Sequence, residues 1–308
     1  MPQKHLLDLW DIDSSDVRRL LKQAATLKAN LKLGVREPLL AQRVLGLLFE
    51  KPSLRTRVSF EAAMAHLGGT TIYLGQDVGW KGREPVADFA NVLGRYVDAI
   101  VFRGSAQESI EDLAEYANCP VINGLTREAH PCQALGDLLT IEERFGGLAG
   151  KKLAYIGDGN NVANSLAIAA AHMNLSFAVA CPQGYSLDES FLRKLHSRFP
   201  TAKIETAPDA TSAARGAHVV YTDVWVSMGD EAEREQRLAA FQGFQVNQAL
   251  MAQADPSAIF LHCLPAHRGE EVTADVIDSQ QSAVYDQAEN RLHIQKAILT
   301  WLILQTDR

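Results

Sequence analysis

Short apolar runs alternate with amphipathic stretches along this chain, and short turns separate them. Residues 13–31 place Val17, Leu20 and Leu27 on one face at helical spacing, which predicts an amphipathic helix. The apolar run 44–49 predicts a strand, and the alternation of such runs with helical patterns is typical of an α/β protein built on parallel sheets. Further strands are expected at 70–74, 99–102, 120–122, 176–180, 203–206, 218–221 and 258–261, and further helices at 86–96, 108–117, 188–199, 209–214 and 288–304.

The length predicts two domains, because 308 residues exceed what one hydrophobic core usually serves. Gly146, Gly147 and Gly150 interrupt the pattern, so we place the boundary near them. The first domain is predicted at 1–146 and the second at 147–287. We expect a parallel sheet flanked by helices in each domain, helices that join the domains, and a C-terminal helix, 288–308, that packs back on the first domain.

Composition excludes several classes of protein. A formal net charge of −7 argues against a nucleic-acid binder, which normally needs a basic surface. The four cysteines, at 119, 132, 181 and 263, show no CxxC pairing, so neither a zinc site nor a disulfide framework is expected, and a reducing cytosol fits. No run of about 18 apolar residues and no export signal is visible. We therefore expect a cytoplasmic protein that is neither exported nor inserted into a membrane.

The stretch 49–61, FEKPSLRTRVSFE, has the pattern of an anion site. A strand ends before Pro52, and Ser53 can then cap a helix that carries Arg55 and Thr56 in its first turn. The free backbone N–H groups and positive dipole end of such a helix attract an anion, and the arginine and hydroxyl add donors that suit a phosphate. An ordinary capped helix with solvated arginines is an equally good interpretation of this stretch alone.

Two further groups are expected near that helix start. Arg103 follows a strand directly, at the carboxyl edge where open α/β sheets bind ligands. In the motif HPCQ, Pro131 suits a first helical position, so His130 and Gln133 lie one turn apart and can grip one small polar group. Taken singly, Arg103 is as easily explained by exposure to water, and a lone histidine and glutamine are more often surface residues.

The second half opens with a strand, a turn with the sequence GDGNN and a helix. This pattern is similar to a dinucleotide-binding unit, but Val162 stands where the third glycine of that fingerprint belongs, after Gly157 and Gly159. The difference weakens the hypothesis of a nicotinamide-dependent dehydrogenase. Asn160 and Asn161 instead offer amides that suit a carboxylate or an amide.

Three clusters follow in the second half. Asp223 begins the loop 223–231 directly after a strand, and its carboxylate could hold an ammonium group or simply cap the next helix. Cys263 and Leu264, in the motif HCLP, lie at another strand's carboxyl end, where the cysteine taken alone is more typical of a buried structural thiol. Arg291 lies near the start of the last helix.

In this order, and over nearly the whole chain, FEKPSLRTRVSFE, Arg103, HPCQ, GDGNN, DVWVSMG, HCLP and AENRLHIQKAIL resemble the carbamoyltransferase family. The motifs Asp-x-x-x-Ser-Met-Gly and His-Cys-Leu-Pro resemble its ornithine-specific members, because aspartate-specific members typically carry proline in place of Cys263. The resemblance implies transfer of the carbamoyl group of carbamoyl phosphate to the δ-amine of ornithine, giving citrulline and phosphate, in arginine biosynthesis. It implies direct attack by the neutral amine, activity that rises toward alkaline pH, and no metal or organic cofactor.

The resemblance also implies a role for individual residues. The catalytic residues would be Arg55, Arg103, His130 and Cys263. The residues that bind carbamoyl phosphate would be Ser53, Leu54, Arg55, Thr56, Arg103, His130, Gln133, Cys263, Leu264 and Arg291. The residues that bind ornithine would be Asn161, Asp223, Ser227 and Met228.

A homotrimer with active sites at the subunit interfaces is implied as well. The polar loop 76–85 would then complete a neighbouring site, with Gln76 and Lys81 as contributors. The chain departs from the family pattern next to this loop, because Phe89 and Asn91 replace a hydroxyl and a charged residue.

Two other functions remain open from the sequence. One is a carbamoyltransferase for another amine, such as putrescine, a modified ornithine or aspartate, which the intact Ser-Met-Gly motif at 227–229 disfavours. The other is a catalytically silent binding homologue, which the joint presence of Arg55, Arg103, His130 and Arg291 disfavours.

Overall fold

The computed structural model describes residues 4–227, 229 and 231–306. It divides into two compact units, one formed by Met1–Leu139 with Glu289–Arg308 and the other by Thr140–Ala288. Two helices carry the chain from one unit to the other, α5 (Pro131–Phe145) and α12 (Val284–Thr306), and α12 ends in the first unit. The predicted domain limits, 1–146 with 288–308 and 147–287, lie near these divisions and stay a prediction.

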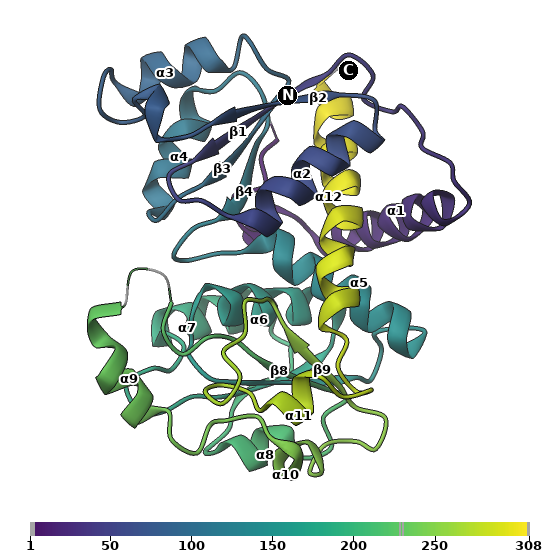
Figure 1. Cartoon of the computed structure of the whole chain (residues 1–308), viewed down its shortest axis with the longest axis vertical. Coiled ribbons are helices and arrows are strands. Elements are labelled where there is room, and N and C mark those ends of the chain that lie inside the picture. Colours follow the sequence, from purple (N-terminus) through teal and green to yellow (C-terminus); the bar gives the residue numbers. More distant parts are fainter. Residues whose placement is uncertain (1–3, 228, 230, 307–308) are drawn as a thin grey trace. The chain divides into compact units, whose positions relative to one another are not determined.

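The first unit is built on a four-stranded parallel sheet with the order β2-β1-β3-β4. Helices α3 and α4 cover one face, and α2 lies on the other with α1 and α12 (Figure 1). The bounds are β1 (Val44–Phe49), β2 (Thr70–Leu74), β3 (Ala99–Arg103), β4 (Val121–Leu125), α1 (Ser14–Lys32), α2 (Leu54–His66), α3 (Val86–Leu93) and α4 (Gln107–Tyr116), with short 3₁₀ turns η1 (Leu9–Asp11) and η2 (Gln76–Val78).

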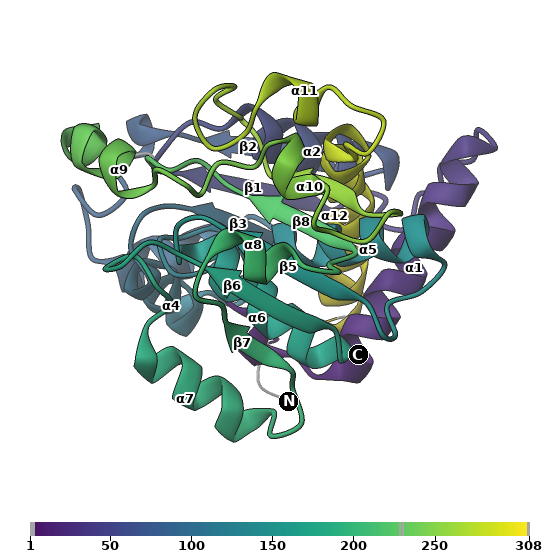
Figure 2. The same cartoon turned by 90° about the horizontal axis from the view of Figure 1, so that it is seen from below.

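The second unit holds a five-stranded parallel sheet with the order β7-β6-β5-β8-β9. Helices α6 and α7 lie on one face and α8, α10 and α11 on the other, as the two views together show (Figure 1, Figure 2). The bounds are β5 (Lys152–Ile156), β6 (Ser176–Ala180), β7 (Ile204–Thr206), β8 (Val219–Thr222), β9 (Ile259–His262), α6 (Asn161–Met173), α7 (Glu189–Arg198), α8 (Ala210–Ala214), η3 (Glu231–Glu233), α9 (Arg234–Ala240), α10 (Gln248–Met251) and α11 (Ala274–Ile277).

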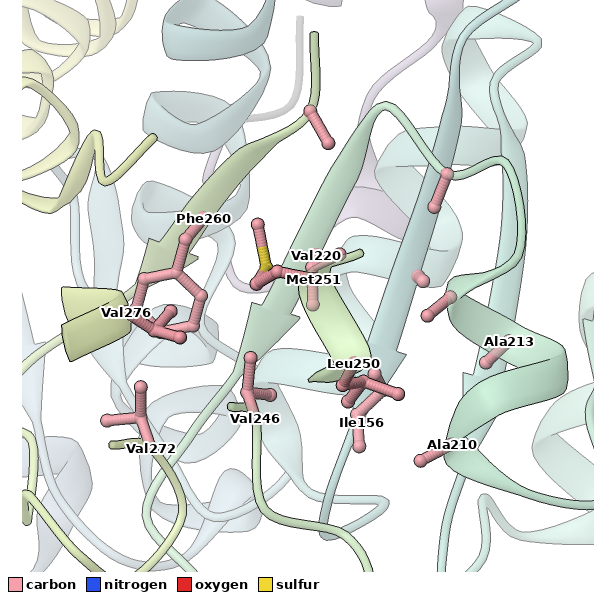
Figure 3. Packing of buried hydrophobic residues seen from close by; sticks show 14 of the residues in the cluster. Ile156, Ala210, Ala213, Val220, Val246, Leu250, Met251, Phe260, Val272 and Val276 are labelled. Carbon is pink, nitrogen blue, oxygen red and sulfur yellow. The ribbon is translucent and has the colours of Figure 1, made fainter. Parts of the chain in front are cut away.

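A buried apolar cluster fixes the strands that carry the candidate site of the second unit. Figure 3 shows Phe260 of β9 beside Val276, and Leu250 near Ile156 of β5. Val220 of β8 belongs to the same cluster and is fully buried. Because close-packed side chains resist displacement, this cluster holds the ends of β5, β8 and β9 in register.

The predicted fold class is confirmed: both sheets are parallel, helices flank them, and the C-terminal helix packs in the first unit. The strands expected at 44–49, 70–74 and 176–180 have these bounds in the structure. The helix expected at 86–96 ends earlier, at Leu93, where Gly94, a residue of low helix propensity, is the C-cap. None of the helices, within the described residues, is long and apolar enough to cross a membrane.

Candidate active site

The first candidate cluster lies at the start of α2, where β1 ends. Ser53 is the N-cap of the helix, and its side-chain oxygen accepts from the backbone nitrogen of Thr56 at 3.3 Å. The helix runs for 13 residues and begins shortly after the carboxyl end of β1. Its first backbone N–H groups and the positive end of its dipole therefore lie at the carboxyl edge of the sheet. The predicted capping residue is therefore confirmed, and the helix start has the geometry of an anion site.

Two arginines from distant parts of the chain meet at one hydroxyl. Arg103 donates from Nη1 to the side-chain oxygen of Thr56 at 3.1 Å, and Arg291 donates from Nη2 to the same oxygen at 2.9 Å. Thr56 is fully buried, and the two arginines are 9% and 4% exposed. Two guanidinium groups held this close in a region of low dielectric create a strong attraction for an anion with several oxygens.

His130 lies next to these charges as a neutral base. Burial, and then the positive charges of Arg291 and Arg103, hold the pKa of His130 well below its usual value of 6.5. One turn along α5, Gln133 is buried and donates from Nε2 to Asp137 at 2.8 Å. A neutral imidazole can donate one hydrogen bond to a carbonyl oxygen without adding a third charge.

This environment leads to a prediction for His130. Its folded pKa lies below the unfolded value, so the folded chain excludes a proton and His130 lowers stability progressively as the pH falls below 6.5. In spectra of the ¹³C-histidine-labelled protein, the His130 ring signal, identified by its loss in His130→Gln, should stay constant from pH 8 to about 5.5. A titration midpoint near 6.5 would contradict the buried, charge-flanked environment.

The second candidate cluster lies in the second unit, at the ends of β8 and β9. The carboxylate of Asp223 is 6% exposed and accepts from the Asn160 side-chain nitrogen at 2.9 Å and the Cys263 sulfur at 3.0 Å. Asn160 is also the N-cap of α6, because its oxygen accepts from the backbone nitrogens of Val162 and Ala163. A carboxylate is the ordinary partner of an ammonium group, and these hydrogen bonds fix the position of this one.

Models of two protein domains match this chain. One is described as the aspartate/ornithine carbamoyltransferase carbamoyl-P binding domain and matches residues 4–143; the other is the Asp/Orn binding domain of the same family and matches residues 149–302. The chain belongs to the aspartate/ornithine carbamoyltransferase family. The Ser53–Arg103–Arg291 cluster occurs in the unit that matches the carbamoyl-P model for most of its length, and the Asp223–Cys263 cluster in the unit that matches the other model.

Several members of the carbamoyltransferase family are similar to this chain over almost their whole length. The ornithine carbamoyltransferase of Pyrococcus abyssi is 50% identical, covering 97% of this chain and 96% of its own, and that of Bacillus subtilis is 52% identical, covering 99% and 95%. The solved structure of the ornithine carbamoyltransferase from Pyrococcus furiosus superposes with a TM-score of 0.93 at 50% identity, covering 96% of each chain.

For the remaining predicted site residues, the structure gives the position in an element and the degree of exposure. Leu54, whose backbone was expected to bind phosphate, is the first residue of α2 and its side chain is 74% exposed. Arg55 follows it and is partly exposed. Asn161 begins α6, and Ser227 lies partly exposed on the loop after β8. Met228 lies outside the described residues.

Sequence reasoning missed the residues that support the turn at Cys263 and Leu264. His262 is fully buried, with its Nδ1 accepting from the Leu264 backbone nitrogen at 2.9 Å and its Nε2 lying 3.1 Å from Glu271. The backbone nitrogen of His262 also donates to the Gln287 side chain at 2.9 Å. The histidine in HCLP was the available signal, but its two partners lie 9 and 25 residues along the chain.

Arg237 was also missed. It donates from Nη1 to the Asp158 carboxylate at 2.8 Å and to the Trp225 carbonyl at 3.1 Å. One guanidinium group therefore ties the turn after β5, which carries the site amide of Asn160, to the loop that begins at Asp223. This arginine comes from the short helix α9, which follows the loop 223–231 and has no clear signal in the sequence.

Gln76 and Lys81 were predicted to act in a neighbouring subunit. Within this chain, Gln76 donates from Nε2 to the Glu50 carbonyl at 3.1 Å, and Lys81 donates to the Ser109 hydroxyl. Their role in a neighbouring subunit stays a prediction.

Two groups of side chains could hold a divalent cation, among the residues that the structure describes. They are Asp223 with His262 and Cys263, and His267 with Glu270 and Glu271; within each group the possible ligand atoms lie within 4.8 Å of one another. Nitrogen, sulfur and carboxylate ligands of this kind suit zinc. In the first group, Cys263 already donates to Asp223, and Nδ1 of His262 accepts from the Leu264 backbone nitrogen.

Proposed function

We propose that this chain is an ornithine carbamoyltransferase. It transfers the carbamoyl group of carbamoyl phosphate to the δ-amine of L-ornithine and releases L-citrulline and phosphate. The observation that carries the proposal is the Asp223 carboxylate, held by Asn160 and by the thiol of Cys263 at the carboxyl edge of the second sheet. Relatives about 50% identical over nearly their full length bear this name. We propose a cytoplasmic location and a biosynthetic role in arginine formation; a relative from Pyrococcus furiosus, 50% identical, is named an anabolic ornithine carbamoyltransferase.

Carbamoyl phosphate would bind in the first unit, with its phosphate at the start of α2. The contributors are the Ser53 hydroxyl, the Leu54 backbone, Arg55, Thr56 and Arg103, which offer hydroxyl, N–H and guanidinium donors to phosphate oxygens. These donors also stabilise the charge that grows on the phosphate as it leaves.

The carbonyl oxygen of the carbamoyl group would be polarised by Thr56, Arg103 and neutral His130. Because these donors are buried and fixed before substrate arrives, they stabilise the oxyanion that forms during attack without reorganising. We assign the carbamoyl nitrogen and its surroundings to Gln133, Arg291 and the backbone carbonyls of Cys263 and Leu264, as the family resemblance implies.

Ornithine would be held in the second unit by its α-amino and α-carboxylate groups. Asp223 supplies the negative partner for the ammonium, and Asn161, Ser227 and Met228 supply the other contacts. The δ-amine must lose its proton before it attacks, since an ammonium near pKa 10.4 has no lone pair. Turnover should therefore rise toward alkaline pH, with Cys263 beside Asp223 as the group placed to tune this ionisation.

A homotrimer is proposed because the family resemblance implies it. Exposed apolar side chains of the first unit occur on α2, on the edge strand β2, and on and just beyond α3: Leu54, Val58, Ile72, Tyr73, Val92 and Tyr96. A surface of this kind is usually covered by another subunit. Light scattering of the purified protein should give three times the 33.7 kDa chain mass, and a monomer would contradict the proposal.

The proposed reaction is tested by citrulline formation from carbamoyl phosphate and L-ornithine. The wild-type chain should form citrulline in amounts equal to the phosphate released. Phosphate release without citrulline would mean hydrolysis, and neither product would mean a silent binding homologue.

A further inference from the structure

The carboxylate of Glu50 accepts hydrogen bonds from two separate segments of the first unit. Glu50 follows β1 directly, and its backbone nitrogen donates to the Arg103 carbonyl at 2.8 Å, where β1 lies beside β3 (Figure 1). Its Oε2 accepts from the backbone nitrogen of Ser105 at 3.0 Å, and its Oε1 accepts from the indole nitrogen of Trp80 at 2.9 Å. The side chain therefore joins the end of β1, the segment after Arg103 and the loop 76–85.

Gly104 shows how closely this carboxylate approaches the backbone. A Cβ at Gly104 would meet Oε2 of Glu50 at 2.5 Å and the ring of Phe102 at 2.4 Å. Both distances are too short for real contacts, so the Glu50 carboxylate occupies space that only a glycine leaves open. Its position therefore bears directly on the backbone next to Arg103.

Trp80 is itself firmly placed. Its ring packs edge-on against Phe89 at 5.0 Å and Phe102 at 5.8 Å between ring centroids. The chain turns on both sides of it, with positive φ at Gly79 and Lys81, and Lys81 is tied to Ser109 of α4. An indole anchored in this way presents its N–H in a fixed direction.

We propose that Trp80 is a positioning residue for the phosphate site and acts through Glu50. Both donors to the carboxylate, the Trp80 indole and the Ser105 backbone, are neutral. They satisfy its oxygens, while the guanidinium of Arg103, whose backbone carbonyl accepts from the Glu50 nitrogen, is bound to Thr56. Without the indole donor, one carboxylate oxygen would be free to compete with phosphate for the arginines.

The inference deepens the proposed function, because it concerns how the same site binds its phosphate. It also gives a role within this chain to the loop 76–85, next to which Phe89 and Asn91 depart from the family pattern. Phe89, one of these departures, is one of the two rings that hold the indole.

The test is Trp80→Phe, which keeps an aromatic ring and removes the indole donor. The KM for carbamoyl phosphate should rise about 10-fold, the effect of one hydrogen bond to a charged group, while kcat and the KM for ornithine change less than about 2-fold. Unchanged KM values, or an equal rise in both, would overturn the proposal. Trp301→Phe is the matched control, since the Trp301 indole nitrogen is buried without a hydrogen-bond partner in the described part of the chain.

A double-mutant cycle tests the route through Glu50. Glu50→Gln removes the negative charge that would compete for the arginines, so the KM for carbamoyl phosphate should stay within about 2-fold of wild type, and the double variant should lose most of the rise caused by Trp80→Phe. A double variant with the full rise of Trp80→Phe would mean that Trp80 does not act through Glu50.

Calorimetry with inorganic phosphate separates this inference from the proposed reaction. Phosphate should bind Trp80→Phe about 10-fold more weakly than wild type and Trp301→Phe. If no variant forms citrulline but this difference remains, the proposed reaction fails and the positioning role stands. If wild type forms citrulline and phosphate affinity is unchanged in Trp80→Phe, the positioning role fails alone.

Discussion

Replacing Arg103 with alanine should lower kcat for citrulline formation by about 10³-fold. Arg103 is buried, donates to Thr56 and lies beside the start of α2, so its loss removes a fixed cation from the proposed phosphate site, where charge grows as phosphate leaves. Removing one preorganised donor typically lowers kcat by about 10²–10³-fold. We expect a loss near 10³-fold because Arg103 carries a full positive charge. Steady-state kinetics with both substrates measures the effect.

Two further variants make the Arg103 result specific. Arg103→Lys keeps the charge and loses the planar fork, so it should recover only part of the activity. Arg43→Ala removes an arginine that pairs with Asp98 at the opposite end of β1, and kcat should stay within about 2-fold of wild type. If Arg103→Ala is folded by circular dichroism and keeps more than about a tenth of the wild-type kcat, Arg103 does not have the proposed role.

Replacing Asp223 with asparagine should raise the KM for ornithine about 100-fold and leave the KM for carbamoyl phosphate nearly unchanged. The substitution keeps the size of the side chain but removes the charge that pairs with the α-ammonium group. It also replaces one carboxylate oxygen with an NH2 donor. That donor would face other donors, because Asn160, Cys263 and the Val224 backbone all donate to this carboxylate. Titration of ornithine at saturating carbamoyl phosphate measures the change.

Asp209→Asn is the matched control for Asp223. Asp209 lies in the same unit and caps α8 by accepting from the Ser212 backbone, a task that asparagine performs equally well. Both KM values should be unchanged in this variant. An ornithine KM that stays within about 3-fold of wild type in Asp223→Asn would contradict the assignment of the α-ammonium group to Asp223.

The local features of the phosphate site could be predicted from sequence because they depend on short spacing. Ser53 caps its helix three residues before Thr56, and Arg103 ends its strand, so both positions follow from neighbouring residues. The meeting of Arg103 and Arg291 at one hydroxyl could not be derived from spacing, since Arg291 lies 235 residues from Thr56. Only the family resemblance brought Arg291 into the site.

The supporting contacts of the second unit could not be predicted for a similar reason. Asn160 was recognised as an amide at the helix start, but its bond to Asp223 spans 63 residues. Arg237 lies on a helix of only seven residues, which periodicity does not distinguish from a loop. Contacts between side chains of two loops that are distant in sequence can be identified only from the three-dimensional structure.

The environment of loop 76–85 differs from the sequence-based expectation. Its polar, glycine-containing sequence favoured an arm toward a neighbouring subunit, while Trp80 drew no separate hypothesis. In the structure Trp80 packs on Phe89 and Phe102 and bonds to Glu50, so the loop is anchored on its own unit. The aromatic pair Trp80 and Phe89, nine residues apart, was the available signal.

The central claim is tested most directly by citrulline formation with a panel of amines. Wild type and Arg55→Ala are assayed with carbamoyl phosphate and L-ornithine, beside putrescine, N-acetylornithine and aspartate, with each carbamoylated product measured. We predict wild-type activity with ornithine alone and its loss in Arg55→Ala. Turnover with another amine instead would contradict the assignment of the loop at Asp223, and ornithine turnover that survives in Arg55→Ala would contradict the phosphate site at the start of α2.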